Sequence, residues 1–236
     1  MKLNDNSLMF RILLKLDISK KEKCFIDKRV NSNANVVFIH IPKTGGTSII
    51  KSLGLISTTH IEAKEVFKNK QDGRVFRNKF SFAIVRDPIE RFVSLYNYAR
   101  MDVSYYHNNI NPETSVHGAH LDYKLLREAN LNECVKFLLE GKLRHDNGWN
   151  HWMPQYTWTH DEYGAICLVD KIYYLNNLEL LKIDFKNKFN RELNIPVLND
   201  SKSDSLIMDL SEESLEGLYQ FYKKDYELFN FKKQGI

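Results

Sequence analysis

The segment 36–54 constrains the fold of this chain more than any other. A run of β-branched and aromatic residues, Val36–Ile41, stops at Pro42 and gives way to a Gly-rich turn, Lys43–Ser48. Apolar residues with helical spacing follow. The pattern predicts a buried strand that runs through a tight turn into a helix N-terminus. Because the first backbone N–H groups of a helix have no intrahelical acceptor and the helix dipole adds positive charge, we expect phosphate or sulfate to bind there.

The position of Lys43 separates this turn from the commonest phosphate-binding loop. In the loop G-x-x-x-x-G-K-[ST] of nucleotide-hydrolysing proteins, the lysine follows the last glycine and the next hydroxyl holds Mg²⁺. Here Lys43 precedes Gly45 and Gly46, and no strand that ends in aspartate is evident as a metal partner. We therefore expect an anion held by lysine and backbone without a metal ion. A nucleotide kinase that uses ATP and Mg²⁺ is the alternative that this spacing disfavours.

A second anion-binding element is predicted by the segment 81–98. The apolar run Ser81–Val85 closes at Arg86, and apolar residues then recur with helical spacing after Asp87-Pro88. Arg86 stands at the carboxyl end of the predicted strand, and Ser94 lies two turns into the helix. A forked guanidinium and a hydroxyl in these places predict a site for one phosphate. We expect Asp87 to cap or brace the turn. Together, the two elements predict a nucleotide that carries two anionic groups.

The sequences HIPKTGGTS and RDPIERFVSLY, taken as a pair, resemble the sulfotransferases that use 3′-phosphoadenosine 5′-phosphosulfate (PAPS). The similarity is to the carbohydrate branch, sulfotransferase family 2, which includes the heparan and chondroitin enzymes. Residues 151–155 resemble a His-aromatic-x-Pro-Gln stretch of that branch. Residues 198–201 and the acidic helix that follows resemble its C-terminal end. The similarity covers roughly residues 36–231, nearly the whole chain.

This resemblance implies a reaction and a set of cofactor-binding residues. The sulfuryl group of PAPS would pass to a carbohydrate hydroxyl without a metal ion, and adenosine 3′,5′-bisphosphate (PAP) would be the product. Lys43 and the loop backbone would hold the 5′-phosphosulfate, and Arg86 with Ser94 would hold the 3′-phosphate. The full set of implied cofactor-binding residues is Pro42, Lys43, Thr44, Gly45, Gly46, Thr47, Ser48, Arg86, Ser94, Ser201 and Lys202.

Two residues are candidates for catalysis. Sulfuryl transfer should resemble phosphoryl transfer, in which positioning and charge neutralisation matter most, and Lys43 can stabilise the departing 5′-phosphate. His60 is the candidate base for the acceptor hydroxyl, since relatives in this branch often carry a histidine between the phosphosulfate loop and the Arg-Asp-Pro strand. Without the family, a histidine at this place is more often a surface residue. His40, Glu62 and Glu65 are the alternative bases, and His40 has a hydrogen-bonded core role as a further alternative.

The acceptor is expected to contact residues 101–160, which combine aromatic side chains with arginines and histidines. Aromatic faces stack on sugar rings, and basic groups suit an anionic glycan. In the alternative interpretation half of these aromatic residues belong to the core, and Trp152 is one that packing explains equally well. Small-molecule or protein-tyrosine acceptors, and an inactive nucleotide-binding module, are the other functions left open. The predicted substrate-binding residues are His40, Tyr105, Trp149, His151 and Trp152.

Alternating strands and helices predict an α/β fold. We expect a single domain with a P-loop-like parallel sheet, helices on both faces, and ligands at the carboxyl ends of the strands. The domain would cover residues 34–236, behind a polar N-terminal arm at 1–33 that is loosely held. The expected strands are 36–41, 80–85 and 166–174, and the expected helices are 47–54, 88–100, 132–140, 177–190 and 211–228.

Composition limits the class of protein. The 236 residues are 43% hydrophobic and 27% charged, which suits one compact enzyme domain. The net charge of +4 without a Lys/Arg block suits anionic ligands and does not indicate nucleic acid. Three cysteines without paired spacing predict neither disulfides nor zinc. The apolar stretch 8–14 is too short to span a membrane, so we expect a cytoplasmic protein. No pattern predicts an oligomeric state.

Overall fold

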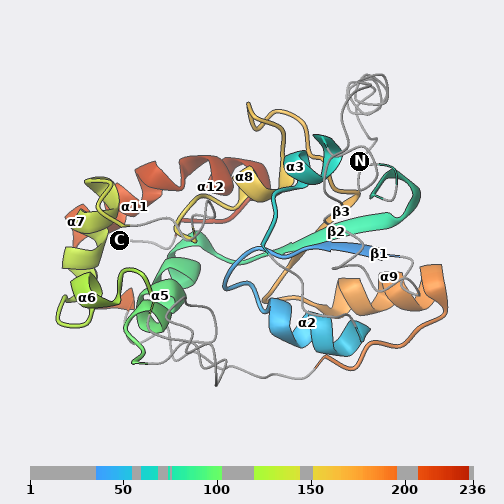
Figure 1. Cartoon of the computed structure of the whole chain (residues 1–236), viewed down its shortest axis with the longest axis horizontal. Helices are drawn as coiled ribbons and strands as arrows, with labels where there is room; N and C mark the ends of the chain where they lie inside the picture. The colour runs from blue at the N-terminus through green and yellow to red at the C-terminus, as the bar shows by residue number, and fades with distance from the viewer. Residues whose placement is uncertain are drawn as a thin grey trace, which may run out of the picture. The chain divides into compact units, whose positions relative to one another are not determined.

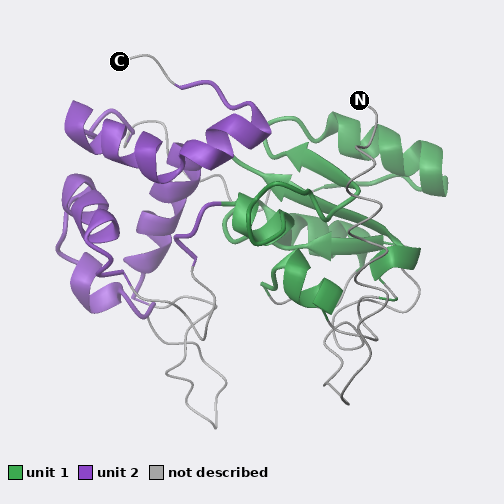
Figure 2. Ribbon diagram, turned by 90° about the horizontal axis from the view of Figure 1, so that it is seen from above, with its two compact units in different colours: residues 1–86, 155–199 green, residues 87–154, 200–236 purple. Residues whose placement is uncertain are grey.

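The computed structural model describes residues 36–54, 60–68, 74, 76–102, 120–143, 151–195 and 207–233. The chain divides into two compact units (Figure 2). Unit 1 comprises residues 1–86 and 155–199, and unit 2 comprises residues 87–154 and 200–236. The predicted N-terminal arm, 1–33, lies outside the described residues, so the predicted domain boundaries stay a prediction.

Unit 1 contains a small parallel sheet. Its strands are β1 (Val36–Ile39), β2 (Phe80–Val85) and β3 (Lys171–Tyr174), in the order β1-β2-β3 (Figure 1). The register pairs Ile39 with Ala83 and Val85 with Tyr174. β-branched and aromatic residues fill β1 and β2 and are almost all buried, as in a sheet covered on both faces. Since the strands are parallel, their carboxyl ends meet at one edge of the sheet.

Helices flank this sheet. Helices α2 (Gly46–Leu53) and α9 (Glu179–Phe189) lie on one side of it in Figure 1, and α3 (Ala63–Lys68) and α8 (Tyr156–Thr159) lie on the other. On the α2 and α9 side, apolar residues with helical spacing pack against aromatic strand residues. These findings confirm a mixed α/β arrangement with a parallel sheet. The buried members of this cluster are Val36, Phe38, Ile49, Leu53, Phe82, Ile84, Tyr173, Leu181, Phe185 and Leu193.

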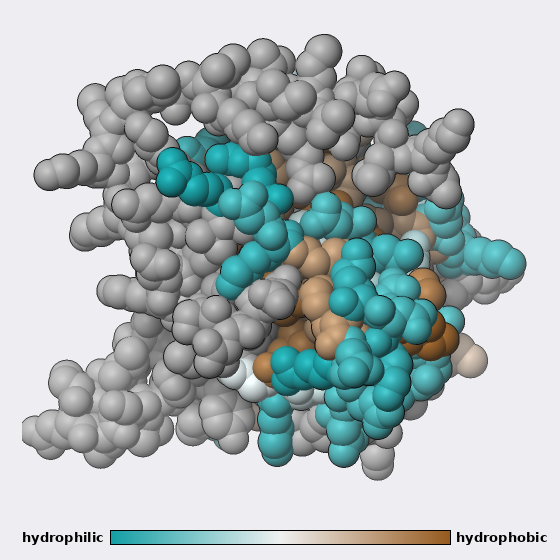
Figure 3. Space-filling view, turned by 90° about the vertical axis from the view of Figure 1, so that its right-hand side faces the viewer, coloured by the Kyte–Doolittle hydropathy of each residue, from teal (hydrophilic) through white to brown (hydrophobic). Residues whose placement is uncertain are grey.

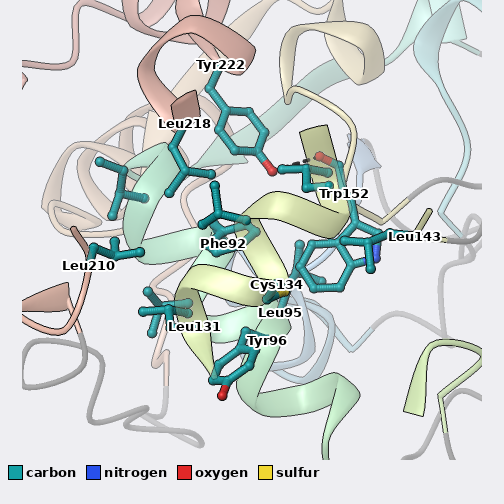
Figure 4. Packing of buried hydrophobic residues seen from close by; sticks show 14 of the residues in the cluster. Phe92, Leu95, Tyr96, Leu131, Cys134, Leu143, Trp152, Leu210, Leu218 and Tyr222 are labelled. Carbon is teal, nitrogen blue, oxygen red and sulfur yellow. Dashed lines mark hydrogen bonds between the residues drawn. The ribbon is translucent and has the colours of Figure 1, made fainter. Parts of the chain in front are cut away.

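Unit 2 is helical in its described part. It contains α5 (Pro88–Ala99), α6 (Tyr123–Leu126), α7 (Leu131–Leu139), α11 (Glu212–Phe221) and α12 (Lys223–Phe229). Apolar side chains from α5, α7 and α11 gather around Trp152 in one core (Figure 4). Within it, the Tyr222 hydroxyl donates a hydrogen bond to the Trp152 carbonyl at 2.8 Å. The core thus joins residues 70 positions apart in the sequence.

Two predicted elements differ from the structure. The strand predicted at 166–174 begins only at Lys171, because the preceding residues form a turn in which the Asp161 carboxylate accepts from the Ala165 and Ile166 amides. The helix predicted at 211–228 is two helices, which are interrupted at Tyr222. Tyr222 is fully buried, and its hydrogen bond to Trp152 is a tertiary contact that helical periodicity does not encode.

The surface formed by the described residues mixes hydrophobic and hydrophilic side chains. One face shows hydrophobic residues in its middle, bordered by hydrophilic residues (Figure 3). Scattered apolar side chains are normal on the surface of a globular protein. The candidate site is therefore built from the buried polar groups at the carboxyl edge of the sheet.

Candidate functional site

The turn between β1 and α2 contains two residues with left-handed backbone. Lys43 and Gly45 both adopt left-handed conformations, with φ of 67° and 77°. A left-handed lysine is uncommon, and such backbone strain is concentrated at functional sites. The Thr44 hydroxyl donates to the Ile41 carbonyl at 3.0 Å and closes the turn. The hydroxyl is thereby engaged in holding the loop.

The N-terminus of α2 is not capped by a side chain. Its cap residue is Gly45, and no acidic residue occupies the first turn. The Ser48 and Ile49 amides donate to the Gly45 carbonyl at 3.1 and 3.4 Å, so the Gly46 and Thr47 amides precede the first intrahelical hydrogen bonds. The helix dipole therefore ends in a positive terminus without a carboxylate of its own, which suits an anion.

Lys43 adds a partly buried positive charge to this loop. Burial and, to a smaller extent, the positive charge of Arg86 together lower the pKa of its ammonium from an ordinary value of 10.5 to about 8. Arg86 directly follows β2, and His40 directly follows β1, at the shared edge of the sheet. Two cations that disfavour each other's charge in the same place favour an anionic ligand.

Gln155 fixes the backbone of Arg86. Its side-chain oxygen accepts from the Arg86 amide at 2.9 Å, and its side-chain nitrogen donates to the Arg86 carbonyl at 2.7 Å. Gln155 is completely buried, and both partners belong to unit 1. The two bonds pair the Arg86 backbone as a neighbouring strand would. Sequence reasoning placed Gln155 in a family-like motif and assigned it no role.

His60 lies beside the first loop, and it is buried. Its Nδ1 is 2.7 Å from the His40 carbonyl oxygen. Since a carbonyl can only accept, Nδ1 carries the proton and Nε2 is the basic nitrogen of the neutral ring. The His60 ring lies 4.2 Å from the His40 ring and meets the edge of the buried Trp158 at 6.1 Å, both measured between ring centroids. The surface interpretation of His60 is wrong, and its tautomer is the one a general base would need if it acts through Nε2.

The other residues of the loop differ in how far they are buried. Pro42 and Thr44 are buried and carry the chain from β1 into the turn, whereas Thr47 is exposed in the first turn of α2. Ser48 is partly buried on the same helix. The structure thus brings the predicted residues of the first anion site together within unit 1. Their contacts with a nucleotide stay a prediction.

Three of the predicted site residues, Ser94, His151 and Trp152, lie in unit 2. Ser94 is buried in α5, and Trp152 is fully buried in the core, where its indole nitrogen donates to Asp122 at 3.0 Å. The carbonyl oxygens of His151 and Met153 accept from the buried Arg91 guanidinium at 2.6 and 2.9 Å. Burial favours the packing interpretation of Trp152 and of His151, and a role in acceptor binding stays a prediction for both. The predicted Tyr105, Trp149, Ser201 and Lys202 lie outside the described residues.

The described part of the chain contains no group of three or more His, Cys, Asp or Glu side chains arranged to hold a metal ion. Among the same residues, no helix is both long and apolar enough to cross a lipid bilayer.

Comparison with known proteins identifies the family. Residues 27–232 match the family model described as the sulfotransferase family, which corresponds to sulfotransferase family 2, the family that the two sequence motifs resemble. The searches of curated proteins and of solved structures returned no match. The matched span contains the loop after β1, Arg86, Gln155 and His60. The chain belongs to the sulfotransferase family.

Proposed function

We propose that this protein is a PAPS-dependent O-sulfotransferase whose acceptor is a carbohydrate hydroxyl. Membership of the family supports sulfotransfer as the reaction. The observation that carries the choice of donor is the pairing of Lys43 and Arg86 at one edge of the sheet, next to a helix terminus without a carboxylate. An activated sulfuryl donor with phosphates at both ends of its ribose matches two cations and a row of amides.

The residues present fit a phosphosulfate group. Gly45 and Gly46 stand where α2 begins, at positions where a Cβ would collide with Leu175 or His40, and the amides of this helix terminus suit an anion. The protonated Lys43 would neutralise charge on the leaving 5′-phosphate, and Arg86 would hold the 3′-phosphate through its guanidinium. PAPS supplies the activated sulfuryl group. We assign Ser94 a place in 3′-phosphate binding only on the family resemblance.

His60 would act as the general base. Nε2 of His60 would accept the proton of the acceptor hydroxyl. At the same time the oxygen of that hydroxyl would form a bond to sulfur, and the bond between sulfur and the 5′-phosphate oxygen would break. The Nδ1–H bond to the His40 carbonyl would keep the ring in the basic tautomer before the transfer and would stabilise the imidazolium after it. The positive charge gained by His60 and the negative charge gained by the leaving phosphate balance.

The proposal is tested by product analysis with the wild-type chain. PAPS and a panel of neutral and anionic glycans, with small phenols and a tyrosine peptide as competing acceptors, would be incubated with and without EDTA. Mass spectrometry should show a glycan that gains one sulfuryl group, at an unchanged rate in EDTA. Matched reactions with Lys43→Met should show a much smaller yield.

Three results would change the assignment. Sulfuryl transfer to phenols or to the tyrosine peptide alone would change the assigned acceptor class, and PAPS would remain the assigned donor. Transfer of phosphate from ATP with dependence on Mg²⁺ would overturn the sulfotransferase assignment and favour the kinase. Binding of PAP without product on any acceptor would favour an inactive nucleotide-binding module.

A further inference from the structure

His40 connects the anion loop to the candidate base through two different parts of the residue. Its backbone carbonyl accepts the hydrogen bond from His60 Nδ1 at 2.7 Å. Its ring lies between Phe38, 5.5 Å away between centroids, and His60, 4.2 Å away. Only 8% of His40 is exposed, so an acceptor cannot reach it easily.

The ring of His40 also touches the first residue of α2. A Cβ built on Gly46 would lie 1.9 Å from His40 Nε2 and 2.1 Å from Cδ2. These distances are far below van der Waals contact, so the imidazole edge lies directly against the Gly46 backbone. Gly46 has no left-handed φ, and an alanine would suit its helical position. The ring of His40 is therefore the obstacle to a side chain at position 46.

These contacts form one continuous path within unit 1. A shift of Gly46 toward the sheet would displace the His40 ring, and a shift of that ring would displace the His60 ring, which contacts it at a tilt of 49°. The carbonyl that sets the tautomer of His60 belongs to the same residue. Packed interiors transmit such displacements because they contain little free volume.

We propose that His40 is a positioning residue that holds the anion loop and the His60 imidazole in one fixed geometry. The effect of this role on catalysis rests on the proposed function. The role replaces the predicted contact between His40 and the acceptor. His40 would act through Gly46 on one side and through His60 on the other. Nothing in the role requires a proton on His40 to move.

The test is a double-mutant cycle with Gly46→Ala, His40→Ala and the combination of both. His40→Asn, also alone and with Gly46→Ala, serves as a second route should His40→Ala fail to fold. Gly217→Ala is the matched control, because Gly217 also lies in a helix and the one tight contact of its Cβ would be with the flexible end of Leu139, at 2.7 Å. Two quantities would be measured: the His60 tautomer, from ¹⁵N chemical shifts of the histidine rings without nucleotide, and the affinity for PAP.

We expect wild-type His60 to show the Nδ1–H tautomer and the control to match it. Gly46→Ala should lower the population of that tautomer and weaken PAP binding by about tenfold or more, the usual scale of overpacking. With His40→Ala or His40→Asn in the same chain, the added alanine at position 46 should weaken PAP binding by less than about threefold, because the obstacle is gone.

Additive effects in the cycle would overturn the inference, since the alanine would then act on the ligand directly. An unchanged His60 tautomer in both Gly46→Ala and His40→Ala would overturn it as well. The proposed function fails separately: if the wild type does not bind PAP, that proposal is lost, and the tautomer measurements still decide the role of His40.

Discussion

The chain leaves β1 and β2 through two junctions that have the same order of strand, turn and helix but differ in how the helix begins. At the first, the cap residue is Gly45 and no side chain bonds to the amides of α2. At the second, the Asp87 carboxylate accepts from the Ile89 and Glu90 amides at 2.9 and 3.1 Å, and Pro88 occupies the first turn of α5.

The difference shows which helix terminus can serve a ligand. A terminus whose amides already bond to a carboxylate has its dipole compensated, so an added anion would be repelled by that carboxylate. A terminus capped by glycine keeps its amides and its dipole for a ligand. Under the proposed function, the anion-binding group at the second junction would therefore be a side chain, that of Arg86, whose backbone is hydrogen-bonded to Gln155.

The largest effect should follow from removal of the base held beside the first junction. We expect His60→Ala to lower turnover by roughly 10²–10⁴, the usual contribution of a positioned base. PAP affinity should change little, because His60 is assigned no contact with the nucleotide. Turnover and calorimetric PAP binding would be measured on the same preparation. A variant with wild-type turnover would exclude His60 as the base and would direct attention to Glu62 and Glu65.

Removal of the partly buried charge of Lys43 should separate activity from stability. Lys43→Met should lower turnover by on the order of 10², the scale of losing one donor that stabilises developing charge. At pH 7 the same change should raise the free energy of unfolding by on the order of 1–3 kcal/mol, because a desolvated ammonium with a lowered pKa destabilises the folded chain. The wild type and Lys43→Met both carry a non-glycine residue at the left-handed position 43, so the difference between their unfolding free energies reports the charge of Lys43.

The pH dependence of that stability difference gives a second readout. Between pH 8 and 10.5 the folded chain has released the Lys43 proton while the unfolded chain still holds it, so this lysine makes wild-type stability rise with pH. The advantage of Lys43→Met over the wild type should therefore shrink across this range. Denaturant unfolding at pH 7 and pH 10 measures the free energy of unfolding of the wild type and of Lys43→Met. A stability difference between the two that does not change with pH would contradict a charged Lys43 with a lowered pKa.

The first junction can be converted toward the second by one substitution. Thr47 is exposed in the first turn of α2, and Thr47→Asp places a carboxylate close to this helix start, two positions beyond the N-cap position that Asp87 holds in α5. We expect the helix to gain about 0.3–1 kcal/mol of stability and PAP affinity to fall by roughly tenfold, since the carboxylate competes for the same terminus. Thr47→Asn is the control, because asparagine has the size of aspartate and carries no charge. Equal loss in both variants would mean that the hydroxyl, not the charge, matters.

The smallest effect should come from the cap of the second junction. Asp87→Ala should cost about 0.5–2 kcal/mol of unfolding free energy, because two amides of α5 lose their acceptor. Asp87→Asn, which can still accept, should recover most of it. A loss of PAP affinity larger than the loss of stability would contradict the assignment of Asp87 to capping.

The sequence predicted the features that depend on neighbouring residues. β2 occupies the predicted range 80–85, and α5 ends one residue short of its predicted range, because alternation, proline and the Asp87 cap are local signals. The Gly-rich turn and the helix terminus of α2 without a side-chain cap were predicted in the same way, whereas the left-handed φ of Lys43 was not. These elements include most of the first anion site.

Contacts between distant residues could not be predicted from local signals. The Gln155 side chain meets the Arg86 backbone across 69 positions, and His60 meets the His40 carbonyl across 20. Such pairings depend on which strands and turns the fold brings to one edge. The break between α11 and α12 has a similar cause, since helical periodicity runs through Tyr222 without interruption while its hydroxyl bonds to Trp152.

Proton uptake on nucleotide binding tests the account most directly. At pH 8.5, above the lowered pKa of Lys43, most wild-type molecules should lack the Lys43 proton, and a phosphate bound beside it should raise that pKa. Calorimetric titration with PAP in two buffers of different ionisation enthalpy measures the protons taken up. We predict uptake of a substantial fraction of one proton by the wild type and none by Lys43→Met. Equal uptake by both chains, or none by the wild type, would contradict a nucleotide held at the junction of β1 and α2.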